Sequence, residues 1–214
     1  MKVLVIGAHG NVGRRVVERM QADDNFEPVA FVRKSEHVKA YEEQGVEARR
    51  GDLLATVDDI KQTMAGVDAV VFSAGAGGSS DANTILIDLD GAVKAMEAAE
   101  ALGIKRFVMV SAYGAGKREN WSKQIIPYYA AKMYADRELM RTDLDYTILR
   151  PGVLGDDEGT GKIQIITSSE EKPIDYTTQR WDVADTILAV LPNETTYREI
   201  YEFVSGGTPI AEAF

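Results

Sequence analysis

The chain has 214 residues, of which 45% are hydrophobic and 27% are charged, as is usual for a globular protein. Its net charge is −10 and it has no basic cluster, so we expect neither nucleic acid nor an anionic membrane surface as a partner. The sequence has no cysteine, which excludes disulfides and thiolate metal sites. Its two histidines, His9 and His37, are too scattered to predict a metal centre.

The length favours one domain over residues 1–214, with residues 151–214 as a minor tail on the substrate side. No apolar run approaches the roughly 20 residues of a membrane span. The apolar stretch at the N-terminus is shorter than the core of a signal peptide. We therefore expect a soluble protein of the cytoplasm that acts on a small molecule, and the sequence predicts no oligomeric state.

Six short apolar runs alternate with segments of helical periodicity. The predicted strands are Val3–Ile6, Pro28–Val32, Val46–Arg49, Ala69–Phe72, Arg106–Val110 and Tyr146–Leu149. The predicted helices are Asn11–Gln21, Glu36–Gln44, Val57–Met64, Ala82–Leu102 and Pro127–Arg141. This alternation predicts an α/β protein, with one doubly wound, Rossmann-type parallel sheet and helices on both faces.

The tail after Pro151 is less regular. It predicts a strand at Lys162–Thr167, a helix at Trp181–Leu191 and a final strand at Glu199–Val204. Ligands of doubly wound sheets bind at the carboxyl ends of the strands, so the residues that follow each strand are the candidate site.

The first predicted strand leads directly into a turn with three glycines, Gly7, Gly10 and Gly13, at GxxGxxG spacing before a helix. Glycine permits a tight turn and the close approach of a pyrophosphate, and the helix N-terminus favours the phosphate charge. In this context the turn predicts a dinucleotide site that also includes Val12. His9 and Asn11 either add polar contacts or are ordinary loop residues.

The residues after the second predicted strand indicate which dinucleotide binds. An NAD site usually has an acidic residue there, about 20 residues past the glycines. This chain has Arg33 and Lys34 instead, and Arg33 is suited to grip a 2′-phosphate with its fork of donors. We therefore predict NADP(H) as the cofactor in preference to NAD(H). The alternative is that both cations belong to a solvated strand end.

Two further strand ends lie at the same predicted edge. Asp52 and Leu53 follow the third strand, where Asp52 is placed to accept from the adenine amino group. Ser73, Ala74 and Gly75 follow the fourth strand, where small residues leave room for the cofactor. Either group can equally serve turn formation.

The fifth predicted strand ends at Ser111, and the helix after it carries Tyr128 and Lys132 at i and i+4, on one face. A tyrosine alone is a poor proton donor at neutral pH, but a nearby ammonium stabilises its phenolate. The pair is thus suited to give a proton to a carbonyl as hydride arrives, and Ser111 to bond the same oxygen. Tyr113 and Lys117 share the spacing, but the glycines between them disfavour a helix.

At these residues the chain resembles the atypical short-chain dehydrogenase/reductases, a compact NAD(P)-binding group often described as epimerase/dehydratase-like. The resemblance covers nearly the whole chain. Its motifs are GAHGNVG at 7–13, FVRK at 31–34, GDL at 51–53, FVMVSAYG at 107–114, YYAAK at 128–132, LDYTILRPG at 144–152 and WDVAD at 181–185.

The resemblance implies that Ser111, Tyr128 and Lys132 are catalytic and that Lys132 also holds the nicotinamide ribose. It places Pro151 and Val153 at the nicotinamide end of the cofactor. Where longer members carry an Asn in the fourth helix, this chain has Asp88, which leaves the role of that Asn unassigned here.

The resemblance also bears on the substrate. Sugar-nucleotide epimerases of this superfamily usually have a larger C-terminal region, so the short tail argues against a bulky nucleotide sugar and favours a small carbonyl or quinone-like compound. Tyr113, Trp121, Ile125, Tyr128 and Tyr129 either line its site or belong to an ordinary loop.

We expect an NADP(H)-dependent oxidoreductase with Tyr128 as the proton donor. The alternatives are a binding protein that senses the NADPH/NADP+ ratio without turnover, and an epimerase or isomerase that keeps its cofactor.

Overall fold

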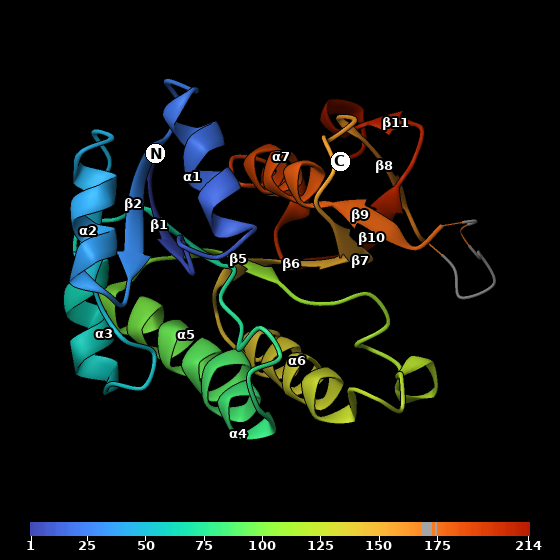
Figure 1. Ribbon diagram of the computed structural model, residues 1–214, viewed down its shortest axis with the longest axis horizontal. Helices are drawn as coiled ribbons and strands as arrows, with labels where there is room; N and C mark the ends of the chain where they lie inside the picture. The colour runs from blue at the N-terminus through green and yellow to red at the C-terminus, as the bar shows by residue number, and fades with distance from the viewer. Residues whose placement is uncertain (168–172, 174) are drawn as a thin grey trace.

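The computed structural model describes residues 1–167, 173 and 175–214 (Figure 1). Within these residues nine strands form one sheet. They are β1 (Lys2–Ile6), β2 (Glu27–Val32), β3 (Glu47–Arg50), β4 (Ala69–Phe72), β5 (Arg106–Val110), β6 (Asp145–Pro151), β8 (Lys162–Ile165), β10 (Glu199–Ser205) and β11 (Thr208–Pro209). Their order is β11-β8-β10-β6-β5-β4-β1-β2-β3.

All six predicted core strands form, with ends shifted by no more than two residues. They pair in parallel, and β10 adds to β6 in parallel as well. The chain reverses its winding direction between β1 and β4, which lie side by side. The expected α/β fold is therefore confirmed, and its topological switch point lies where the glycine-rich turn begins.

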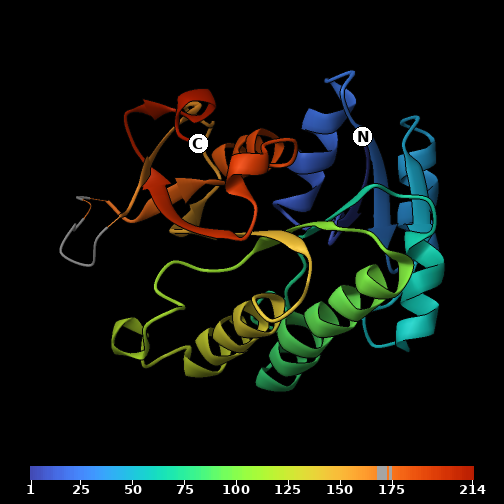
Figure 2. The same ribbon diagram turned by 180° about the vertical axis from the view of Figure 1, so that it is seen from behind.

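Helices cover both faces of the sheet. They are α1 (Gly13–Gln21), α2 (Ser35–Glu42), α3 (Val57–Met64), α5 (Ala92–Leu102), α6 (Ile126–Leu139) and α7 (Arg180–Val190). Figure 1 shows α1 and α7 above the sheet and α5 and α6 below it, and Figure 2 shows the same two layers from behind.

Alternating residues of β1 feed two separate hydrophobic cores, as the side-chain period of two in a strand requires. Val3 and Val5 pack with α1 and α7 in one core. Leu4 and Ile6 pack with α3, α5 and α6 in the other. All four of these side chains are fully buried.

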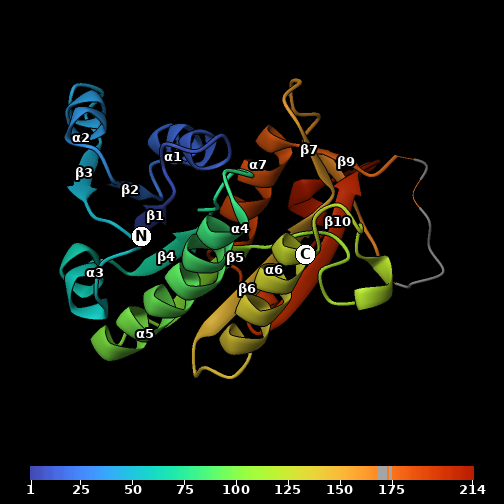
Figure 3. The same ribbon diagram turned by 60° about the horizontal axis from the view of Figure 1, so that its bottom comes forward.

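The predicted helix Ala82–Leu102 is wrong as one continuous α-helix. The structure divides it into α4 (Asp81–Asn83), a π-helix η1 (Thr84–Gly91) and α5. The wider π-turn changes which residues face inward. Ile85, expected on the apolar face, is 52% exposed, whereas Asp88 is 2% exposed. Figure 3 shows this helical segment lying beside α6.

The predicted elements of the tail form as β8, α7 and β10, with small shifts at their ends. The sequence did not predict β7 (Val153–Gly155), β9 (Thr177–Gln179) or β11, which are too short to show an alternating pattern. Strands β7 and β9 pair with each other as a second sheet, and β8 runs antiparallel to β10.

None of the described helices has both the length and the apolar character needed to cross a membrane.

Candidate cofactor and active site

The glycine-rich turn joins β1 to α1 at the switch point of the sheet. Gly7 has a φ of +87°, and a Cβ there would meet the backbone of Ala74, 2.7 Å from its nitrogen. A Cβ on Gly13 would collide with the carbonyl oxygen of Gly7. Two of the three glycines are thus required by close backbone approach, and the third, Gly10, donates its amide to the Gly7 oxygen at 2.8 Å.

Two side chains fix the turn from outside. The hydroxyl of Tyr41, on α2, donates to the carbonyl of Ala8 at 2.8 Å. The guanidinium of Arg15, on α1, donates to the carbonyl of Asn11 at 2.7 Å. Tyr41 and Arg15 are both buried, so the turn is held before any ligand arrives. Asn11 and Val12 lie at the start of α1, where helix amides lack partners within the helix.

The end of β2 carries exposed cations. Arg33 is exposed, and no hydrogen bond or ion pair occupies its guanidinium among the described residues. The ammonium of Lys34 lies 3.1 Å from a carboxylate oxygen of Glu36. Beside them the rings of His9 and His37 stack with 3.5 Å between centroids. No acidic residue occupies the position directly after β2.

The ends of β3 and β4 have different structural roles. The Ser73 hydroxyl donates to the carbonyl of Ile6 at 3.0 Å, which ties β4 to the last residue of β1. Asp52 accepts from the amide of Leu54 at 3.0 Å, so its side chain supports a turn. Leu53 is 7% exposed and belongs to the core.

Asp88 joins the end of β4 to the Tyr–Lys helix. One carboxylate oxygen lies 3.2 Å from the ammonium of Lys132, and the other accepts from the amide of Ala76 at 2.8 Å. The same ammonium donates to the carbonyl of Val110 at 3.3 Å. A Cβ on Gly75 would lie 2.9 Å from a carboxylate oxygen of Asp88, so a larger residue there would displace this side chain.

Lys132 and Tyr128 come together as the sequence predicts. The Lys132 ammonium lies 5.7 Å from the centroid of the Tyr128 ring. Burial acts to lower the pKa of Lys132, but Tyr128 and Asp88 favour the ammonium and leave that pKa raised. Lys132 therefore stays cationic at neutral pH, as stabilisation of a phenolate requires.

Ser111 follows Val110, whose carbonyl accepts from Lys132, but its side chain is turned into the protein. It is 4% exposed, sits beside the carboxyl of Asp136, and is not among the residues that line the cavity. Asp136 follows Lys132 by one helical turn, and its carboxylate lies 2.9 Å from the guanidinium of Arg150. Burial raises the pKa of Asp136, while Arg150 and Ser111 oppose that rise. Arg150 also reaches Glu202, with 3.3 Å between the charged groups.

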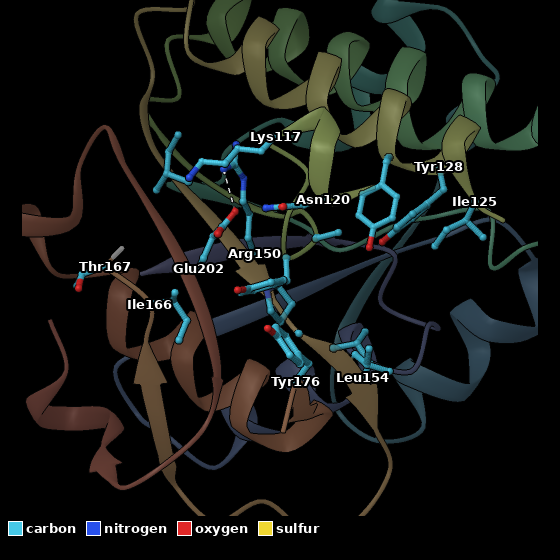
Figure 4. Close-up of a pocket in the computed structure, with 18 residues that line it drawn as sticks. Lys117, Asn120, Ile125, Tyr128, Arg150, Leu154, Ile166, Thr167, Tyr176 and Glu202 are labelled. Carbon is cyan, nitrogen blue, oxygen red and sulfur yellow. Dashed lines mark hydrogen bonds and ion pairs between the residues drawn. The ribbon is translucent and has the colours of Figure 1, made fainter. Parts of the chain in front are cut away.

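A cavity of about 850 Å³ opens next to Tyr128 (Figure 4). Tyr128 points its hydroxyl into this cavity, and Tyr176 approaches from the opposite wall. The lining combines aromatic, apolar and charged side chains: Ala112, Tyr113, Gly116, Lys117, Asn120, Ile125, Tyr128, Tyr129, Arg150, Pro151, Gly152, Val153, Leu154, Ile166, Thr167, Tyr176, Ile200 and Glu202. Trp121 is not in the lining, but it stacks on Tyr129 with 6.0 Å between rings.

Two features of the structure fit a dinucleotide. The glycine-rich turn lies at the switch point of the sheet, and Arg33, whose guanidinium has no partner among the described residues, follows β2. Pro151 and Val153 line the adjoining cavity, at the carboxyl end of β6. The cofactor edge and the cavity therefore meet near Tyr128.

Sequence reasoning missed three charged groups at the cavity. The buried Asp136 pairs with Arg150, and Glu202 reaches Arg150 from the tail; Arg150 and Glu202 both line the cavity. The sequence offered one indication of Asp136: it follows Lys132 by four residues, which places both side chains on the same helical face. Nothing in the sequence indicated that Glu202 lies beside Arg150 on the neighbouring strand.

These features define a Rossmann-type NAD(P)-binding protein. A family model described as NAD(P)H-binding matches residues 7–194, and the chain belongs to this family. Bacillus subtilis YhfK, named an uncharacterized sugar epimerase, is 44% identical over 214 residues, with 100% of this chain and 98% of the relative covered.

Two solved structures are similar over nearly their full length. The oxidoreductase ylbE from Lactococcus lactis is 33% identical and has a TM-score of 0.89, with 100% of this chain and 94% of that chain covered. ChuY from Escherichia coli O157:H7, described as an anaerobillin reductase, is 25% identical and has a TM-score of 0.82, with 96% and 97% covered. These findings confirm the resemblance to the compact, epimerase-like short-chain dehydrogenase/reductases.

Proposed function

We propose that the chain is an NADP(H)-dependent oxidoreductase that reduces a small carbonyl or quinone-like substrate, with Tyr128 as the proton donor. The observation that carries this proposal is the pairing of Tyr128 with Lys132 at the wall of the cavity. The Tyr128 hydroxyl faces the cavity, and the ammonium beneath its ring is buried and held by Asp88.

The bound nicotinamide would supply a hydride. As that hydride reaches the substrate carbon, the Tyr128 hydroxyl gives its proton to the substrate oxygen, and the C–O double bond becomes single. Lys132 stabilises the resulting phenolate, which regains a proton from water through the open cavity. Ser111 is buried beside Asp136, so this scheme assigns it no contact with the substrate.

The preference for NADP(H) rests on the end of β2. Arg33 is unpaired among the described residues, and no carboxylate follows the strand to hold a ribose 2′-hydroxyl. Lys34 shares its charge with Glu36, so Arg33 is the stronger candidate for the 2′-phosphate.

The cavity supports a flat, conjugated substrate. Four tyrosines contribute to its lining: Tyr113, Tyr128, Tyr129 and Tyr176. Aromatic side chains of this kind present large planar faces for stacking. ChuY, which has a similar structure, is described as a reductase, and this description supports reduction as the reaction of the present chain.

The test measures NADPH oxidation with a panel of quinones and aldehydes. Tyr128→Phe should bind NADPH like the wild type and lose turnover. Tyr129→Phe, which changes a neighbouring lining residue, should keep most of the activity. Full turnover by Tyr128→Phe would remove Tyr128 from the mechanism, and NADPH binding without turnover on any acceptor would favour a redox sensor.

An epimerase is the second candidate, favoured by the name given to YhfK. An epimerase returns its hydride to the substrate, so it consumes no cofactor overall. Conversion of a hydroxylated substrate to its stereoisomer, without net change in nicotinamide absorbance, would support this alternative over the reductase.

A further inference from the structure

The two histidines of the chain form a stacked pair that joins the glycine-rich turn to α2. His9 lies in the glycine-rich turn and His37 lies on α2, and their rings stack at 3.5 Å with 15° between planes. Tyr41 follows His37 by one helical turn and bonds to Ala8. One face of α2 therefore contacts two consecutive residues of the turn, Ala8 and His9.

The surroundings of this pair are predominantly cationic. Lys34 and Arg14 act on His9 from the end of β2 and from α1, and both disfavour its charged form. Glu36 is the acidic group that faces the pair, 3.6 Å from His37, but it also pairs with Lys34. The Tyr41 hydroxyl is occupied by Ala8 and is buried.

These charges determine the protonation of His9 in the free protein. Burial first, and then His37, Lys34 and Arg14, lower the pKa of His9 below its usual value of 6.5. His9 is therefore mainly neutral at neutral pH. Protonation of both stacked imidazoles is unfavourable without a nearby anion, because like charges at this separation repel.

A phosphate group changes that balance, because it carries a charge of about −1.5 to −2 at pH 7. We propose that the His9–His37 pair takes up a proton when the ribose 2′-phosphate binds, so that NADP(H) affinity rises as pH falls through neutrality and NAD(H) affinity does not. This inference rests on the proposed preference for NADP(H). It makes the pair a proton-linked part of the 2′-phosphate site, next to Arg33 and Lys34.

The sign follows from linkage. A phosphate raises the pKa of an imidazole beside it, so the complex binds more protons than the free protein between the two pKa values. In that window lower pH favours the complex. A rise of one pKa unit changes the affinity by at most about tenfold, and by less when the pH lies between the two pKa values. The second pKa of phosphate itself, about 6, works in the opposite direction, so the useful window lies above it.

The first experiment is an NMR titration of the histidine ring signals in the whole protein. The chain has only two histidines, so each signal belongs to His9 or His37 and can be assigned with His9→Asn and His37→Asn. Saturating NADP+ should raise the apparent pKa of at least one ring by about one unit, and NAD+ should not. Unchanged titration curves with bound NADP+ would overturn the proposal.

The second experiment compares dissociation constants for NADP+ and NAD+ at pH 6.5 and 8.5. We expect the wild type to bind NADP+ about two- to fivefold more tightly at the lower pH, with little change for NAD+. His9→Asn/His37→Asn should retain a preference for NADP+ and lose this pH dependence. The same dependence in the double variant would assign it to another group and contradict the proposal.

The two failures are distinguishable. Equal affinity for NADP+ and NAD+ at both pH values would contradict the 2′-phosphate site itself, and with it the proposed cofactor. A constant preference for NADP+ at both pH values would keep that cofactor and contradict only the role of the histidine pair.

Discussion

Asp88 and Lys132 form a buried ion pair, with 3.2 Å between the carboxylate and the ammonium and side-chain exposures of 2% and 7%. The pair connects the π-helix η1 to α6, and through Ala76 it also reaches the loop after β4. Asp88 thereby positions the lysine that lies beneath Tyr128. It also provides the negative charge that a buried ammonium requires.

Replacing Asp88 should destabilise the protein strongly. Asp88→Ala leaves a buried ammonium unpaired, which costs about 3–5 kcal/mol of unfolding free energy. Asp88→Asn should cost less, because an amide oxygen can still accept from Ala76. Urea denaturation measures the loss of unfolding free energy in both variants.

Asp90→Asn is the matched control for these variants. Asp90 pairs with Lys94 on the same helical segment but is 51% exposed, and such exposed pairs contribute about 0–1 kcal/mol. A loss no larger than that of the control would show that the buried pair does not stabilise the fold.

The stability effect of Asp88→Ala should depend on pH. The pKa of Lys132 is raised, because Tyr128 and Asp88 together outweigh burial. A raised pKa adds stability that is fully present below the unfolded value of 10.5 and is lost as pH rises through the folded value. The difference between the wild type and Asp88→Ala should therefore be constant near neutrality and shrink above pH 10.5. A difference that grows with pH would contradict this sign.

Arg33→Ser should reduce the preference for NADP(H). A charge-assisted hydrogen bond contributes about 1.5–3 kcal/mol, so NADP+ affinity should fall about 10- to 150-fold, with NAD+ affinity nearly unchanged. Titration calorimetry with both cofactors measures the effect. Arg141→Ser, at an exposed arginine just beyond α6, should alter neither affinity. Equal losses for NADP+ and NAD+ would indicate that Arg33 does not contact the 2′-phosphate.

Gly13→Ala should push α1 away from β1, because the new methyl group collides with the Gly7 carbonyl. Overpacking of this kind costs about 1–3 kcal/mol, and the displaced helix should also weaken cofactor binding. Gly207→Ala is the control, because a Cβ there meets nothing within 4 Å. A thermal melt and an NADPH titration of the two variants test this. Equal melting temperatures would contradict the close approach at Gly13.

The parts of the fold that repeat a strong local pattern could be predicted. Strands such as Ala69–Phe72 are continuous apolar runs, and their positions follow from the sequence. The break at Thr84–Gly91 could not be predicted, because a π-turn replaces an α-turn without changing the residue types. The burial of Asp88 there depends on Lys132, which lies on another helix.

The candidate site shows the same division. The glycine turn and the Tyr128–Lys132 spacing are local, so they predicted which groups come together. The burial of Ser111 brings the end of β5 beside Asp136 of α6, and Arg150 of β6 pairs with the same carboxylate. Such contacts between distant segments leave no spacing rule in the sequence.

The cavity draws its walls from two parts of the chain. Tyr128 comes from the segment before β6, whereas Tyr176 and Glu202 come from the tail after it. The glycine turn and Arg33 lie entirely in the first part. Mutations in the tail can therefore reshape the cavity while the turn that would hold the dinucleotide stays intact, which gives relatives of this chain a route to new substrates with an unchanged cofactor.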